Sequence, residues 1–78
     1  MSETSNLKKQ EDEELMQQSL TDLMNELKSI VDWFNAGDVD VEVASVKFDR
    51  GAKLAEAIKR KLSITENKVN EIKLKLQD

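Results

Sequence analysis

The sequence predicts an all-α protein: an antiparallel two-helix hairpin of the coiled-coil or spectrin-repeat kind, with a second helix longer than the first. Three observations predict it. Apolar residues recur at alternating intervals of three and four from residue 44 to residue 76, which is a heptad seam. A shorter seam runs from residue 20 to residue 34, and the segment 37–40 between the seams contains glycine and aspartate. Such a hairpin exposes apolar surface on which other helices can pack. We therefore expect this chain to act by binding helices rather than by catalysis with its own residues.

The N-terminal residues 1–12 are expected to form a disordered tail, because they offer only one apolar side chain after Met1. Residues 13–78 then form the hairpin domain, with a first helix over about residues 13–36. The acidic run of residues 11–14 suits the start of this helix, where carboxylates favour the positive end of the dipole. A metal site or a basic partner is the alternative use of the run. Ser19 is a good cap candidate, so Leu20 is the alternative start of the helix.

Residues 37–40 are expected to form the turn, and the second helix is expected over about residues 41–76. Gly37 supplies the left-handed position that ends many helices, and Asp40 is the expected cap of the second helix. Residues 39–43 alternate as a strand does, but no second strand is predicted that could pair with them. Asp38, Asp40 and Glu42 resemble the opening of a calcium loop that lacks its glycine and its glutamate at the twelfth place. The sequence therefore predicts a turn and a cap here.

Folding about this turn pairs large residues with small ones across the two seams, as interdigitated packing requires. The expected pairs are Phe34 with Ala44, Ile30 with Phe48, Leu27 with Gly51, Leu23 with Ala55 and Leu20 with Ile58. A glycine inside a helix costs about 1 kcal/mol relative to alanine and is tolerated where another helix must come close. Phe48 and Gly51 are therefore expected to be packing residues of the hairpin.

The first helix is too short to cover the second beyond about Leu62, so the rest of the longer seam has no partner within the hairpin. A second apolar stripe lies one residue behind this seam and comprises Val43, Val46, Leu54, Ala57 and Ile64. Trp33 flanks the shorter seam and either packs between the helices or is a hot spot for a partner. The expected partner-binding residues are Leu54, Ile58, Leu62, Val69, Ile72, Leu76 and Trp33. Since chains of this size seldom build a sufficient core, self-association or a larger partner is expected.

The chain has no Cys and no His, which excludes disulfides and zinc sites built from thiolate or imidazole ligands. It has no glycine-rich phosphate loop, and a two-helix hairpin offers no pocket that could shift the pKa of a carboxylate or lysine by burial. We therefore expect no catalytic residue, cofactor or metal on this chain. The polar, acidic N-terminus does not read as a signal peptide, and no apolar run reaches the roughly 20 residues of a membrane span. A soluble, cytoplasmic protein that does not bind membranes is expected.

The net charge of −4 is unevenly distributed, since residues 1–40 carry three basic and ten acidic residues and residues 41–78 carry nine basic and six acidic ones. This asymmetry favours an acidic helix antiparallel to a basic one, although each exposed pair contributes only about 0.2–1 kcal/mol. The overall acidity argues against tight nucleic-acid binding by this chain alone. The basic cluster of Lys59, Arg60 and Lys61, with Lys53 one heptad before Arg60, is either a solvated face or a phosphate-contacting patch.

The segment from Leu20 to Val69 resembles the small subunit of exodeoxyribonuclease VII. The residues that carry the resemblance are Glu26-Leu27, Ile30-Val31, Gly37-Asp38-Val39, Glu42, Phe48, Gly51, Leu54, Leu62 and Glu66 with Lys68-Val69. The spacing of fourteen residues between the two glycines, the second in an aromatic-x-x-Gly-x-x-Leu setting, distinguishes this pattern from a generic coiled coil. Ile58 stands where members often have Cys, and Phe34, Val39 and Val41 stand where Leu is usual, so the apolar character is kept.

The resemblance implies a non-catalytic subunit, several copies of which associate as helical hairpins with one large subunit. In that family the large subunit carries the nucleolytic centre and an OB-fold, and the complex degrades single-stranded DNA to short oligonucleotides with 5′-phosphates. Single-stranded DNA would then be a partner only through the complex, and no catalytic residue of that enzyme maps onto this chain.

The sequence leaves two alternative functions open. The first is a stand-alone, homo-oligomeric coiled-coil adaptor or a prefoldin-like holdase, which would have no nuclease partner. The second is a direct single-strand binder that uses Lys53, Lys59, Arg60 and Lys61 and would need aromatic residues on which bases can stack.

Overall fold

The computed structural model describes the backbone of residues 2–77 and the side chains of residues 9–77. Three helices form this part of the chain: α1 (Ser2–Gln17), α2 (Leu20–Asn35) and α3 (Val41–Gln77). No strand occurs among these residues, so the predicted all-α class is confirmed. The prediction of two helices is wrong, because a break at residues 18–19 divides the expected first helix into α1 and α2.

Ser19 is the residue that produces this break. Its backbone is extended (φ −67°, ψ 155°), and its hydroxyl accepts a hydrogen bond of 3.0 Å from the backbone N–H of Asp22. The N–H of Gln18 donates to the carbonyl of Leu15 at 3.1 Å and closes α1. Serine competes with the continuing helix by offering its own acceptor to the next turn, so the chain starts a new helix and changes direction.

The expected disordered tail over residues 1–12 also differs from the structure, in which residues 2–12 belong to α1. The prediction considered only the apolar content of this segment. In the structure Leu15, near the end of α1, is 1% exposed, and Glu11 forms ion pairs with α3. These contacts hold the C-terminal half of α1 against the rest of the molecule.

The link between α2 and α3 combines a C-terminal glycine with an N-terminal aspartate. The Ala36 N–H donates to the carbonyls of Asp32 and Trp33, and Gly37 follows at φ +90°, a conformation that favours glycine. The Asp40 carboxylate accepts hydrogen bonds from the N–H of Glu42 at 2.8 Å and of Val43 at 3.3 Å. This cap satisfies two backbone donors at the start of α3, so the alternating segment 39–43 enters the helix at Val41 instead of forming a strand.

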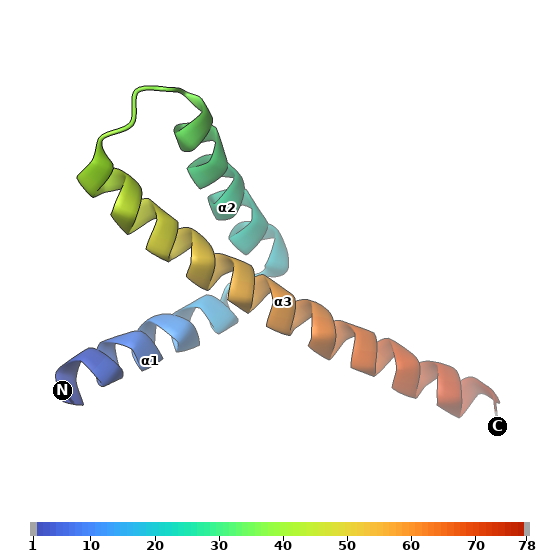
Figure 1. The fold of residues 1–78 in the computed structure, drawn as a ribbon. Coiled ribbons are helices and arrows are strands. Elements are labelled where there is room, and N and C mark those ends of the chain that lie inside the picture. Colours follow the sequence, from blue (N-terminus) through green and yellow to red (C-terminus); the bar gives the residue numbers. More distant parts are fainter. Residues whose placement is uncertain (1, 78) are drawn as a thin grey trace.

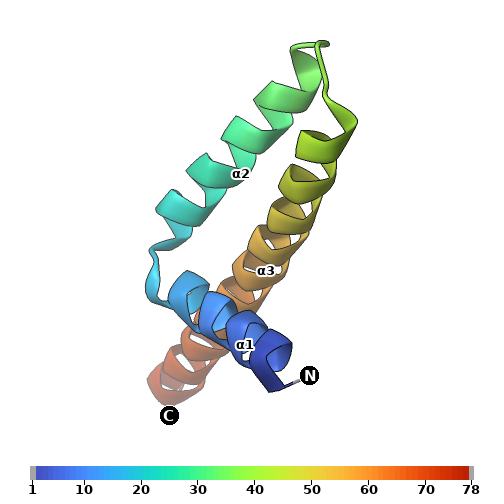
Figure 2. The same ribbon diagram turned by 90° about the vertical axis from the view of Figure 1, so that its left-hand side faces the viewer.

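The helices are arranged asymmetrically along α3 (Figures 1 and 2). α1 and α2 diverge from their link, which lies beside the middle of α3, and both pack on the N-terminal half of α3. α2 runs antiparallel to α3, whereas the C-terminal half of α3 extends alone. The Cα trace spans 57 × 36 × 13 Å with a radius of gyration of 16.5 Å, against about 11.5 Å for a compact domain of this length. The chain therefore leaves much of its longest helix without a neighbour.

The core is small and lies where the three helices meet. Each helix contributes one fully buried leucine: Leu15 from α1, Leu23 from α2 and Leu54 from α3. Ile30 and Ala57 complete the buried set, and the side chains packed against it are Met16, Leu27, Phe34 and Ile58.

The buried face of α3 is rotated from the predicted one. Phe48 and Ala55, expected to pack against α2, are exposed, whereas Leu54 and Ala57 of the second apolar stripe are buried. The physical reason is the third helix. Because both α1 and α2 cover α3, its buried arc is centred between them rather than on the heptad seam.

Candidate partner-binding surface

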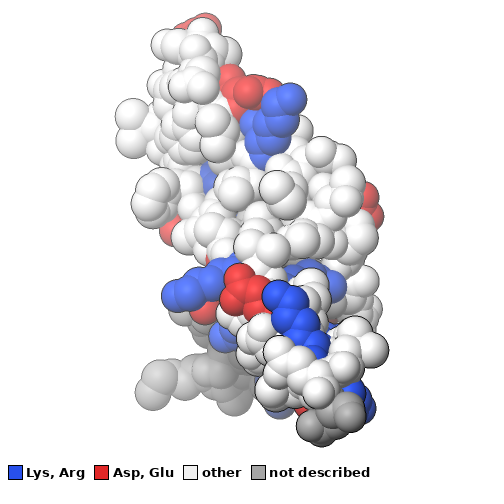
Figure 3. Space-filling view, turned by 90° about the vertical axis from the view of Figure 1, so that its right-hand side faces the viewer, with Lys and Arg blue, Asp and Glu red and all other residues white. Residues whose placement is uncertain are grey.

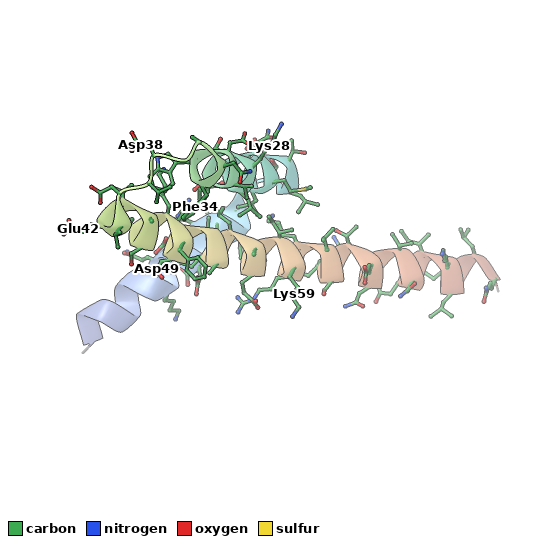
Figure 4. The ribbon with its side chains drawn as sticks, turned by 45° about the horizontal axis from the view of Figure 1, so that its top comes forward. Lys28, Phe34, Asp38, Glu42, Asp49 and Lys59 are labelled. Carbon is green, nitrogen blue, oxygen red and sulfur yellow. The ribbon has the colours of Figure 1, made fainter. Side chains whose placement is uncertain are left out.

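The exposed apolar surface of α3 is the main candidate site. An apolar side chain that no other helix covers fully recurs at every seventh position along α3. These residues are Val41, Phe48, Ala55, Leu62, Val69 and Leu76. Ile72 lies beside them in the part of α3 that extends beyond α1 and α2. Leu62 is 45% exposed, Val69 43% and Ile72 57%. Figure 4 shows this half of α3 with side chains on all sides and no facing helix. We call Leu62, Val69, Ile72 and Leu76 the free seam.

The other expected partner-binding residues lie elsewhere. Leu54 is 0% exposed within the three-helix core, so it cannot contact a partner while the helices stay packed. Ile58 is half-buried against the same core. Trp33 is half-buried, makes an edge-to-face contact with Phe34 at 5.1 Å and lies under the Lys47 ammonium at 5.1 Å. Trp33 thus has packing and cation–π contacts within the chain, which fits the packing alternative for this residue.

A shallow groove of about 240 Å³ separates α2 from α3 and extends the exposed apolar surface toward the turn. Leu27, Val31 and Phe34 line it from α2, and Phe48 and Gly51 line it from α3. Phe34 lies between the two helices (Figure 4), whereas Phe48 is 69% exposed at the edge of the groove. An added Cβ at Gly51 would meet Leu27 Cδ1 and Ile30 Cγ2 at 3.7 Å each. Gly51 therefore lies where side chains of α2 pack directly against the backbone of α3.

A cluster of four charged residues ties the three helices together on one side. Arg50 of α3 donates two hydrogen bonds to the Glu26 carboxylate of α2, from Nε at 2.6 Å and Nη2 at 2.9 Å. Its third nitrogen, Nη1, donates to Glu11 of α1 at 3.0 Å, and Lys53 Nζ donates to the same carboxylate at 2.6 Å. The pairing of an acidic N-terminal half with a basic C-terminal half thus occurs through these residues.

No local pattern in the sequence predicts this cluster. The acidic run with Glu11 suited a solvated helix start, with a metal site or a basic partner as the alternative, Lys53 belonged to a basic patch, and Arg50 was not among the expected site residues. The charge asymmetry was the one signal in the sequence that could have suggested such pairs.

The cluster shifts the pKa values of Glu11, Glu26 and Arg50. Hydrogen bonds from Lys53 and then Arg50 lower the pKa of Glu11, and the hydrogen bond from Arg50 lowers the pKa of Glu26. The same bonds raise the pKa of Arg50, which stays charged. The side chains are roughly one third exposed, so solvent screens these interactions.

We expect acid to weaken the three-helix junction through this cluster. A carboxylate whose pKa is lowered on folding stabilises the fold above its unfolded pKa, and this contribution is lost as the pH falls through the folded value. The ordinary value is 4.5, so the melting temperature should be nearly constant from about pH 7 to 5.5 and fall below about pH 4.5. Thermal melts followed by circular dichroism measure this. The variant Glu11→Gln/Glu26→Gln is the control, and an equal acid-induced fall in that variant would rule out the cluster as the cause.

The basic residues proposed for single-strand binding are only partly available. Lys53 is bound to Glu11, and Arg60 lies 3.7 Å from Glu56 on the same helix. Lys59 and Lys61 remain near them on α3, with Lys59 on the side away from α2 (Figure 4). No exposed pair of aromatic rings accompanies this cluster among residues 9–77, since Trp33 and Phe34 pack against each other at the far end of α2.

The acidic residues of the described chain are not arranged as a metal site. In the part of the chain that the structure describes, no group of three or more acidic residues is arranged to hold a metal ion. Asp40 uses its carboxylate to cap α3, and Asp38 lies exposed in the turn. Nor is any helix between residues 2 and 77 both long and apolar enough to cross a membrane.

A family model described as "Exonuclease VII small subunit" matches residues 21–71. The match covers more than half of the chain. The chain belongs to the exonuclease VII small subunit family. This confirms the resemblance seen in the sequence, and the matched segment is the α2–turn–α3 hairpin, which contains the groove and the free seam as far as residue 71. α1 precedes the match. No curated protein and no solved structure matches the chain.

Within the exonuclease VII small subunit family, the hairpin is therefore the shared unit. The residues that line the groove lie inside it, as do Leu62 and Val69 of the free seam, whereas Ile72, Leu76 and the residues of α1 lie outside. The part of the molecule that the family model matches thus contains the groove and the first half of the free seam.

Proposed function

We propose that this chain is the non-catalytic small subunit of an exonuclease VII-like complex. In this proposal it binds the large catalytic subunit along α3 and supports degradation of single-stranded DNA to short oligonucleotides with 5′-phosphates. The chain contacts DNA only through the complex. Several copies would bind one large subunit, each through its own α3.

The free seam is the observation that carries the proposal. An isolated helix with Leu62, Val69, Ile72 and Leu76 exposed along one side leaves apolar surface in water, and each such side chain contributes about 1.5–3 kcal/mol when fully buried. A helix of the large subunit laid along this seam would bury it, and membership of a family of small subunits supports that identity for the partner.

Replacing Val69 with aspartate tests the seam. We expect Val69→Asp to weaken binding of the large subunit by roughly 10- to 100-fold, since an apolar contact is lost and a charge must be desolvated. The fold should not change, because Val69 is 43% exposed and belongs to the C-terminal half of α3, which extends beyond the other helices (Figure 1). Leu74→Asp is the matched control, because Leu74 is 65% exposed and lies five residues on, about 140° around α3 from Val69.

The measurements are affinity by titration calorimetry and exonuclease activity on labelled single-stranded DNA by the reconstituted complex. Equal affinities of Val69→Asp and the unmodified chain would show that the seam is not the interface. A stable homo-oligomer that does not bind the large subunit would favour the adaptor reading instead.

A further inference from the structure

The charges beside the free seam are mostly basic. The residue before each of Leu62, Val69 and Leu76 is a lysine, and the residue after Ile72 is also a lysine. These flanking residues are Lys61, Lys68, Lys73 and Lys75, and the acidic residues near them are Glu66 and Glu71, the latter directly before Ile72. In helix pairs such positions face the charged side chains of the partner and set partner choice. Viewed from the C-terminal side, Lys and Arg side chains are prominent in the lower half of the molecule, where α3 extends past α1 and α2 (Figure 3).

The covered half of α3 shows how a basic flank is satisfied in this molecule. Arg50 and Lys53 stand beside Gly51 and Leu54, and the helices that cover them present carboxylates at 2.6–3.0 Å. Beyond these helices α3 carries further lysines, but no other helix of the described chain presents carboxylates to them. Among the described side chains, the four lysines beside the free seam form no ion pair.

We propose that the free seam binds a helix whose own apolar heptad residues are flanked by glutamate or aspartate. The inference names the chemistry of the partner helix and rests on the proposed function for the protein that carries it. A second α3 is a poorer occupant. Antiparallel pairing would place Lys61, Lys68 and Lys75 opposite one another. Parallel pairing would place Lys68 opposite Lys73 and would offset this repulsion only by placing Lys61 opposite Glu66.

Two synthetic helical peptides provide the direct test. Both have about four heptads with the same leucine and isoleucine seam, and their flanking positions are all glutamate in one and all lysine in the other. We expect the full chain to bind the acidic peptide at least about tenfold more tightly at low salt, with the difference shrinking as salt screens the charges. Fluorescence anisotropy of the labelled peptides measures both affinities. Equal binding, or preference for the basic peptide, overturns the proposal.

Charge reversal on α3 provides the matched variants. Lys68→Glu/Lys75→Glu should reverse the preference between the two peptides and weaken binding of the large subunit about tenfold or more. Lys9→Glu/Lys28→Glu changes the net charge equally at exposed sites away from the seam, Lys28 lying on the side of α2 away from α3 (Figure 4), and should leave both affinities unchanged. Equal effects of the two double variants would show that the net charge of the chain, and not the lysines beside the free seam, determines the affinity. That result would contradict the proposal.

The outcomes separate this inference from the proposed function. Selective binding of the acidic peptide without binding of the large subunit would support the inference and contradict the proposed function. Binding of the large subunit that is insensitive to salt and to Lys68→Glu/Lys75→Glu would support the proposed function and contradict the inference. Sedimentation showing that the free seam pairs two copies, or anisotropy showing that the lysines bind single-stranded DNA with the seam still exposed, would overturn the inference.

Discussion

Replacing Gly51 with leucine should separate α2 from α3 and abolish binding of the large subunit, while the chain stays largely helical. A Cβ at this position would lie 3.7 Å from both Leu27 and Ile30, so it fits, but the three further carbons of leucine would enter the groove between the helices and press on these side chains. Overpacking of this kind costs about 1–3 kcal/mol or more, which is a large fraction of the stability of so small a core. The helices themselves depend on local bonds and the new residue favours helix, so the loss is tertiary.

The alanine variant is the control for this prediction. Gly51→Ala adds only the Cβ, which meets its neighbours at ordinary contact distance, and it removes a helix-interior glycine. It should stabilise the fold by about 0.5–1 kcal/mol and leave binding intact. Circular dichroism gives helicity and the melting temperature, and co-purification gives binding. Recovery of the large subunit with Gly51→Leu at the yield of the unmodified chain would contradict the predicted close approach.

Truncating Leu54 is the second change with a large expected effect. This side chain is fully buried in the cluster that Leu15, Leu23 and Leu54 form with Ile30 and Ala57 where the three helices meet, so Leu54→Ala should cost about 2–5 kcal/mol. The melting temperature should fall by about 10 °C or more in a domain of this size. Leu74→Ala, at a side chain that is 65% exposed, should change the stability by less than about 0.5 kcal/mol.

This variant also separates two roles for Leu54. The sequence placed it among the partner-binding residues, which predicts weaker binding with an unchanged melting temperature. The structure places it in the core, which predicts a lower melting temperature in the isolated chain. Thermal melts of the isolated chain distinguish the two, and an unchanged melting temperature would favour the first role.

Much of the hairpin could be predicted because its signals are local. Gly37 ends α2 by adopting positive φ, and Asp40 caps α3 through hydrogen bonds to residues two and three positions on. The long apolar repeat of α3 and the family pattern also lie in continuous sequence. These features need no knowledge of the rest of the fold, so the turn and the exposed end of α3 followed from the sequence.

The sequence offered Ser19 as a cap and Leu20 as an alternative helix start, and α2 begins there, but local signals could not decide that a helix also precedes the break or predict the charged cluster. A serine cap contributes only about 1 kcal/mol, so whether it interrupts a helix depends on what each half then contacts. Here α1 gains the burial of Leu15 and the ion pairs of Glu11 with Arg50 and Lys53. These partners are 39 and 42 residues away from Glu11, and no local pattern connects them.

The sequence by itself determined that the chain is helical, where its main turn lies and which family it resembles. It also determined that α3 extends beyond the helices that pack on it. Only the tertiary structure decided which side of α3 is buried. Two apolar stripes one residue apart lie about 100° apart around a helix, and either can be covered. The choice between them depends on how many helices pack on α3, and the third helix turned Leu54 inward and left Phe48 exposed.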